Sequence, residues 1–154
     1  LKRQIKLKAL QEWELSWTKS KQGQQYKGFE LMPHWKPAER LKNSDRLRQS
    51  TITQLKLSHD YFRSYLSRFS SYESNLCHSI CCSKQDVKHI LLACKYYRSE
   101  QREMSQSLEH LPVTLKTLFC TKEGLKALNI YLMKTKVATR RWILGQDQDQ
   151  DQEE

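Results

Sequence analysis

Glycine, proline and long apolar runs are all scarce in this sequence. The 154 residues include four glycines and three prolines, and few segments alternate between apolar and polar residues, so a large β-sheet is not expected. No run approaches the roughly 20 apolar residues of a membrane span, and the first five residues lack the apolar centre of a signal peptide. We therefore expect an intracellular protein, in the nucleus or cytoplasm, that has no membrane partner.

Acidic residues are sparse except at the C-terminus. The chain carries 27 basic and 17 acidic residues, for a net charge of +10. Five of the acids lie in residues 145–154, so residues 1–144 combine 27 basic residues with 12 acidic ones, an excess of 15 positive charges. An excess of this size favours polyanionic partners, and the phosphate backbone of RNA or DNA is the first to consider.

Apolar residues are few as well, which limits the size of the core. Only 38% of the residues are hydrophobic and the mean hydropathy is −0.81. Chains of this kind usually need a further constraint, such as a metal, a partner or a parent protein. The sequence also begins with Leu rather than Met, from which we expect a fragment, a cleaved product or a truncated open reading frame.

Apolar residues at helical spacing predict a mostly α-helical protein. We expect Leu47, Ile52 and Leu55 to face inward from the second helix. The helices are expected over residues 2–18, 46–57, 61–69, about 84 towards 108, 115–120 and 122–143. This organisation comprises an N-terminal helix and connector (1–43), helices around a metal site (44–111), a C-terminal helical segment (112–144) and a disordered acidic tail (145–154).

Four of the five cysteines lie within 18 positions, with a histidine between them. Cys77, Cys81, His89 and Cys94 follow the pattern C-x3-C-x7-H-x4-C. Structural zinc takes four tetrahedral ligands and prefers thiolate and imidazole, so the pattern predicts one structural Zn²⁺. Because the step from His89 to Cys94 exceeds one helical turn, the helix that carries His89 is expected to end or bend before Cys94.

A second choice of ligands remains open. Cys82 can replace Cys81, which gives C-x4-C-x6-H-x4-C. The spacing favours Cys81 because it leaves a longer return to His89. His78 is adjacent to Cys77 and is expected to point away from the metal. In the alternative without a metal, each cysteine is a small buried apolar residue and the histidine is an ordinary helix-surface residue.

Motifs for catalysis are missing. Four protein ligands leave no open position on a zinc for a reacting water. The H-E-x-x-H pattern, the zinc-deaminase pattern and the phosphate-cradling glycine loop are all absent from the sequence. We therefore expect no catalytic residue, no cofactor besides zinc and no small-molecule substrate.

Basic and aromatic residues gather in and beside the predicted metal site. Lysine and arginine contact phosphates, and tyrosine stacks on unpaired bases. The predicted contacts to RNA or DNA are Lys84, Lys88, Lys95, Tyr96, Tyr97, Arg98, Arg140 and Arg141. A longer phosphate track would add Arg63, Arg68, Lys134 and Lys136. In the alternative reading the charges are only solvated, the tyrosines pack between helices, and the protein is a zinc-stabilised structural or protein-interaction module.

Several segments between about residues 10 and 144 resemble one family. The stretch 55–62, LKLSHDYF, is similar to the motif L-R-T-G-H-G-x-F; HILL at 89–92 and CKYY at 94–97 match H-[IVL]-L-L and C-x-x-Y. Trp13 and Trp17 and the segment 137–142, VATRRW, also fit. The chain resembles the C-terminal region of the reverse transcriptase polyprotein of fungal LINE-type (non-LTR) retrotransposons, of the Tad or jockey-like kind.

The resemblance implies an accessory region, because the polymerase, ribonuclease H and endonuclease motifs of such polyproteins lie upstream. It implies that the region binds template RNA or target DNA during target-primed reverse transcription, with the upstream reverse transcriptase and ribonuclease H domains as further partners. Of the family's T-G-H-G, only His59 is kept, and Cys82 is an extra cysteine. These departures indicate a diverged copy.

Overall fold

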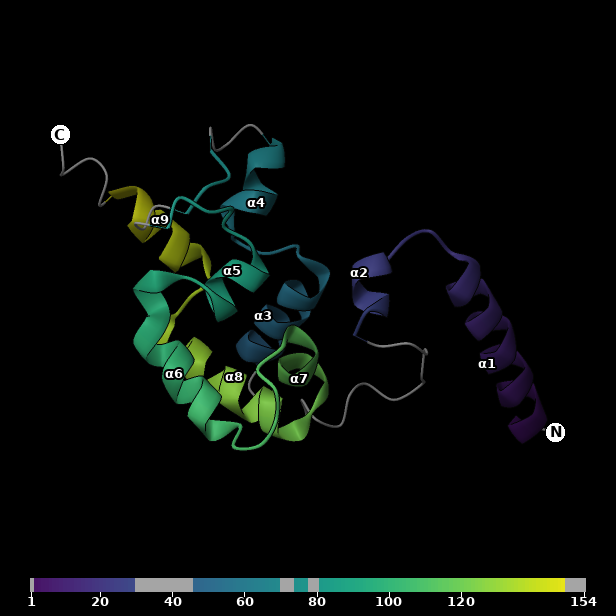
Figure 1. Ribbon diagram of the computed structural model, residues 1–154. Coiled ribbons are helices and arrows are strands. Elements are labelled where there is room, and N and C mark those ends of the chain that lie inside the picture. Colours follow the sequence, from purple (N-terminus) through teal and green to yellow (C-terminus); the bar gives the residue numbers. More distant parts are fainter. Residues whose placement is uncertain (1, 30–45, 70–73, 78–80, 149–154) are drawn as a thin grey trace.

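The computed structural model describes residues 2–29, 46–69, 74–77 and 81–148 (Figure 1). Within these ranges the only regular structure besides helices is one isolated antiparallel bridge, between Leu76 and Lys84, so the predicted, mostly α-helical fold class is confirmed. The α-helices are α1 (Lys2–Lys19), α2 (Gln24–Lys27), α3 (Arg46–Leu57), α4 (Arg63–Leu66), α5 (Val87–Leu92), α6 (Arg98–Ser107), α7 (Leu115–Cys120), α8 (Lys122–Thr135) and α9 (Arg140–Gln148). Two 3-10 helices are η2 (Ser67–Phe69) and η3 (Lys95–Tyr97).

The core forms where α6 and α7 pack against α8, with α3 and α5 beside them (Figure 1). The most deeply buried apolar side chains include Ile52, Leu55, Ile90, Leu91, Leu118 and Leu128. Tyr131 on α8 crosses the core and donates a hydrogen bond to the Ile90 carbonyl at 2.8 Å. Residues from the expected segments 44–111 and 112–144 therefore share one core.

The start of α8 explains why a glycine is needed there. Thr121 Oγ1 accepts a hydrogen bond from Gly124 N at 2.9 Å and donates one to the Thr117 carbonyl at 2.8 Å. This cap folds α8 back on α7 so closely that a Cβ on Gly124 would lie 2.0 Å from the Thr117 oxygen. Only glycine lets the two helices meet in this way.

The predicted long helix from about 84 towards 108 is divided in the structure. α5 ends at Leu92, η3 follows, and α6 begins at Arg98. The expectation that the helix ends before Cys94 is confirmed. The predicted helix 61–69 is also shorter, because Phe62 is extended and buried, α4 begins at Arg63, and the chain tightens into η2 at Ser67.

The predicted helix 122–143 is wrong in its middle. α8 ends at Thr135 because Lys136 and Ala138 adopt left-handed backbone conformations, with φ of 57° and 60°. The chain then restarts as α9, which runs through Gln148. Residues 145–148 are therefore helical rather than part of a disordered tail. The rest of that predicted tail, like residues 30–43 of the predicted connector, lies outside the described residues.

Apolar residues of α3 and α1 are exposed, and the prediction that Leu47 faces inward is wrong. Leu47 is 70% exposed, because it sits in the first turn of α3, while Ile52 and Leu55 further along are buried. No residue of α1 is buried, and in Figure 1 this helix extends away from the bundle. Its C-terminal end contacts α2 through Trp17 and Tyr26, whose rings meet edge to face at 6.2 Å. No helix in the described part of the chain is long and apolar enough to cross a membrane.

Candidate metal centre

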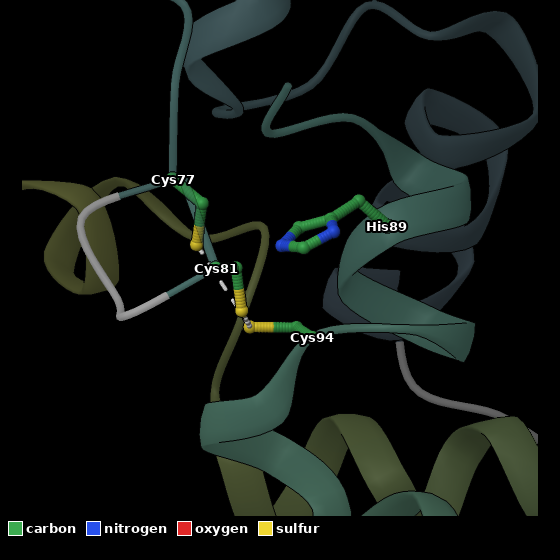
Figure 2. Close-up of side chains that lie close together, drawn as sticks. All are labelled: Cys77, Cys81, His89 and Cys94. Carbon is green, nitrogen blue, oxygen red and sulfur yellow. Dashed lines mark hydrogen bonds between the residues drawn. The ribbon is translucent and has the colours of Figure 1, made fainter. Parts of the chain in front are cut away.

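Backbone pairing holds together the two ends of the segment that carries Cys77 and Cys81. Cys77 N donates to the Ser83 carbonyl at 2.8 Å, and Gln85 N donates to the Asn75 carbonyl at 2.9 Å. The bridge between Leu76 and Lys84 lies between these two contacts. This narrow pairing points both cysteine side chains to the same side (Figure 2).

The helix α5 places the histidine. Asp86 caps it, because its Oδ1 accepts a hydrogen bond from His89 N at 2.8 Å, and the buried Ile90 and Leu91 anchor the helix in the core. His89 is left facing the cysteines at 8% exposure. Sequence reasoning placed the helix start two or three residues too early. The aspartate three residues before His89 was the available signal for a cap.

The end of α5 places the fourth residue. The amides of Ala93 and Cys94 both donate to the His89 carbonyl, at 2.9 and 2.7 Å. This closes the helix, and Cys94 is then extended, with φ −65° and ψ 123°. Its side chain therefore returns toward His89 although the two residues are five positions apart.

These four residues form the cysteine–histidine cluster: Cys77, Cys81, His89 and Cys94. One possible ligand atom from each lies within 4.8 Å of all the others. The Cys94 sulfur is 3.8 Å from that of Cys77 and 3.9 Å from that of Cys81. Sulfurs bound tetrahedrally to zinc at about 2.3 Å would lie about 3.8 Å apart, whereas disulfide sulfurs are bonded at about 2.05 Å. The cluster can hold a metal ion.

The histidine supports the same conclusion. His89 Nε2 is buried and has no hydrogen-bond partner among the described residues. Figure 2 shows a ring nitrogen of His89 directed at the three sulfurs. A buried polar atom without a partner is costly, and a metal bond would remove that cost. In addition, Lys95 N donates a hydrogen bond to the Cys81 sulfur at 3.2 Å.

The structure distinguishes the two neighbouring cysteines. Cys81 contributes its sulfur to the cluster, whereas Cys82 is exposed, has a left-handed φ of 44° and does not belong to it. His78 lies outside the described residues. Cys120 is on α7, well away in sequence, and its thiol donates to the Phe29 carbonyl at 3.1 Å.

Most of the predicted nucleic-acid residues are exposed. The exposed set comprises Lys84, Lys88, Lys95, Tyr96, Arg98, Arg140 and Arg141. Tyr96 is 74% exposed and directly follows Lys95. Arg140 and Arg141 are on α9, where they line an open hollow with Leu144 and Gly145.

The prediction that Tyr97 stacks on bases is wrong. Its side chain is 7% exposed, and its hydroxyl accepts a hydrogen bond from Trp142 Nε1 at 2.7 Å. Burial raises the pKa of Tyr97 to about 12. Its ring packs edge to face against Tyr96 and Tyr131, so no ring face is left for a base.

The longer phosphate track is also interrupted. Arg63 is 5% exposed and therefore cannot reach a phosphate. Lys134 forms a salt bridge with Glu103. Arg68 and Lys136 are exposed. Arg102, which sequence reasoning missed, is exposed on α6 one turn after Arg98, and the spacing of four residues was the signal for a shared helix face.

The loop that resembles the family's T-G-H-G motif holds a buried carboxyl group. Asp60 Oδ1 accepts a hydrogen bond from Phe62 N at 3.0 Å, while Oδ2 is buried without a partner in the described part of the chain. Burial raises the pKa of Asp60 to about 7. His59, the one residue kept from that motif, stacks on Tyr65 with ring centres 5.0 Å apart.

No protein-family model, curated protein or solved structure matched the chain. The retrotransposon resemblance therefore stays a prediction, and the cysteine–histidine cluster is the feature on which a function can be argued.

Proposed function

We propose that this chain is a zinc-stabilised accessory region that binds RNA or DNA. The observation that carries the proposal is the cysteine–histidine cluster beside a positively charged surface. Three thiolates and one imidazole suit zinc better than hard cations such as calcium or magnesium, which prefer oxygen ligands. The zinc is structural in this proposal, because four protein ligands fill its coordination and leave no position for a substrate.

The charge around the cluster supports nucleic acid as the partner. Lys84 and Lys88 flank the start of α5, and Lys95 follows Cys94 directly; all three are exposed. Tyr96, at 74% exposure, offers an aromatic ring next to these charges. Phosphates would pair with the lysines, and a base would stack on the tyrosine.

The resemblance to fungal LINE-type retrotransposons supports a more specific proposal. In it, the chain is the part of a reverse transcriptase polyprotein that follows the ribonuclease H domain. It binds template RNA or target DNA during target-primed reverse transcription, in the nucleus or cytoplasm. The chemistry belongs to the parent polyprotein, and this chain contributes binding. The departures at residues 57–60 are consistent with a diverged copy.

The first test is zinc content per chain in freshly purified protein. We expect about one zinc in the parent and far less in Cys94→Ser, with Cys120→Ser as the control because Cys120 is outside the cluster. Binding to RNA and to DNA is then measured at several salt concentrations. Affinity that falls steeply with salt supports phosphate contacts. A folded parent without zinc would refute the metal proposal, and a zinc-loaded parent that binds neither RNA nor DNA would refute the nucleic-acid proposal.

The second candidate function is a structural or protein-interaction module, and α1 favours it. None of its residues is buried, and Ile5, Leu7 and Leu15 are 60%, 53% and 61% exposed. A helix of this kind can dock on other parts of a polyprotein. Apolar docking hardly responds to salt, so the same salt series separates the two functions.

A further inference from the structure

A groove lies between the end of α5 and one face of α6. Its volume is about 280 Å³, and its apolar lining comes from Leu91, Leu92, Met104 and Val113. Leu91 and Met104 are buried, whereas Val113 is 38% exposed at the rim. The floor of the groove is therefore formed by buried side chains, and its rim is accessible to solvent.

The groove is held in place by a contact between its two walls. Gln101, which also lines it, donates a hydrogen bond from Nε2 to the Ile90 carbonyl at 3.0 Å. The same carbonyl accepts the Tyr131 hydroxyl. The two helices α5 and α6 are thus tied to each other and to α8, so these two walls of the groove are fixed by the core, while Val113 comes from the loop between α6 and α7.

Two arginines border this apolar lining. Arg98 and Arg102 both line the groove and lie four residues apart on α6. Like charges at this spacing destabilise a helix. Neither guanidinium has an ion pair or hydrogen bond in the described structure. Two unpaired cations beside one groove indicate an anionic ligand.

The distance between the two arginines indicates which kind of anion the groove would bind. Residues four apart on a helix are separated by about 6 Å along its axis, which is comparable with the distance between successive phosphates of an extended single strand. A nucleotide also brings a flat apolar base, which the lining can cover. Continuity with the exposed Lys95 and Tyr96, three and two residues before Arg98, favours a nucleic-acid strand over an acidic peptide.

We infer that the groove between α5 and α6 is a nucleotide subsite, which takes one unpaired base while Arg98 and Arg102 contact the flanking phosphates. The inference rests on the proposed nucleic-acid binding and deepens it, because a base in the groove cannot stay paired in a duplex. The protein would therefore prefer single strands to duplexes of the same length.

The test compares variants in the groove with control variants that carry a matched substitution elsewhere on the surface. Arg102→Glu is paired with Lys116→Glu on α7, since both residues are exposed and the change in charge is the same. Val113→Trp fills the rim of the groove and is paired with Ile130→Trp on α8, which is 48% exposed and outside the groove. The zinc-loaded full chain is titrated with fluorescent single-stranded RNA and DNA and with duplexes of equal length. Thermal melting of each variant checks that it is folded.

We expect Arg102→Glu and Val113→Trp each to weaken single-strand binding by roughly tenfold, while both controls stay within about threefold of the parent. Duplex binding should not respond to Val113→Trp. A single strand with one abasic position should bind the parent less tightly, and Val113→Trp should remove that difference.

Other outcomes overturn the inference. If the parent binds nucleic acid and the groove variants match their controls, the groove is not a subsite, although the proposed function survives. If the groove variants lose binding only to an acidic leucine-containing peptide, the groove is a peptide site. A parent that binds no nucleic acid overturns both this inference and the nucleic-acid function.

Discussion

Trp142 donates a hydrogen bond from its indole Nε1 to the hydroxyl of Tyr97 at 2.7 Å. The contact links α9 to η3, the turn that directly follows Cys94 of the cysteine–histidine cluster. Trp142 also packs edge to face on Phe62, with ring centres 5.5 Å apart. The C-terminal helix thus packs against both the turn after the cysteine–histidine cluster and the residue that precedes α4.

Breaking this link should destabilise the protein. Trp142→Phe leaves the buried Tyr97 hydroxyl without its donor, and Tyr97→Phe leaves the indole without its acceptor. Each change should lower the unfolding free energy by about 1–3 kcal/mol. In a double-mutant cycle measured by chemical denaturation, the pair should show a coupling of about 0.5–1.5 kcal/mol. Additive losses would mean that the hydrogen bond is not made in solution.

The two adjacent cysteines should behave differently toward metal. Cys81→Ser removes a cluster sulfur and should abolish stoichiometric zinc, together with the thermal stabilisation that zinc gives. Cys82→Ser changes an exposed thiol outside the cluster and should leave both unchanged. Zinc analysis and melting curves with and without a chelator provide the measurements. The reverse result would assign the ligand to Cys82.

Glycine at position 124 should be indispensable. Gly124→Ala places a Cβ against the Thr117 carbonyl at 2.0 Å, so α7 and α8 must separate. The clash should outweigh the roughly 1 kcal/mol that alanine gains over glycine in a helix. We expect a net loss of about 2 kcal/mol or more in the unfolding free energy.

The control for this change is Gly145→Ala on α9, where a Cβ would meet nothing within 4 Å. There the helix preference acts alone, and the unfolding free energy should rise by up to about 1 kcal/mol. If Gly124→Ala were also stabilising, the close packing of α7 on α8 would be refuted.

Asp60 should make the protein less stable as pH rises. Its pKa is raised from 3.8 to about 7 in the folded state, so the folded protein binds a proton that the unfolded chain has already lost. Between about pH 4 and 7, stability therefore falls as pH increases, by up to about 4 kcal/mol in total. Asp60→Asn keeps the acceptor for Phe62 N and removes the charge.

We expect Asp60→Asn to be more stable than the parent near pH 8, with the difference shrinking toward pH 5. Unfolding by denaturant across this range gives the measurement. Glu12→Gln on the exposed face of α1 serves as the control and should follow the parent at every pH. A parent and an Asp60→Asn variant with parallel pH profiles would show that the carboxyl is not buried.

Local patterns predicted much of the fold and the cluster. The predicted bounds of α3 and α7 match the structure to the residue, and the buried residues of α3, which are Thr51, Ile52, Leu55 and Lys56, repeat at helical spacing. The cysteine and histidine spacing predicted the cluster, and the five-residue step from His89 predicted the break before Cys94. These features depend on residues that are close together in the sequence, so one sequence is enough to predict them.

Features that depend on distant residues were missed. Tyr97 is buried because Trp142, 45 residues later, folds over it, and no local pattern predicts that contact. The helical spacing of apolar residues continues from α8 past Lys136 to Ala138 and Trp142, so the left-handed backbone of Lys136 and Ala138 cannot be seen in that spacing. The groove that includes Arg102 likewise requires α5 and Val113 to lie beside α6.

The compactness of the cysteine–histidine cluster in the sequence also has a consequence for the order of folding. All four residues of the cluster fall within 18 consecutive residues, so closing the chain around an ion would cost little loop entropy. On a ribosome this segment emerges before α8, which supplies Tyr131 and most of the opposing core. A metal-bound nucleus can therefore exist while the C-terminal helices are still being synthesised, and those helices would then dock on a surface that is already formed.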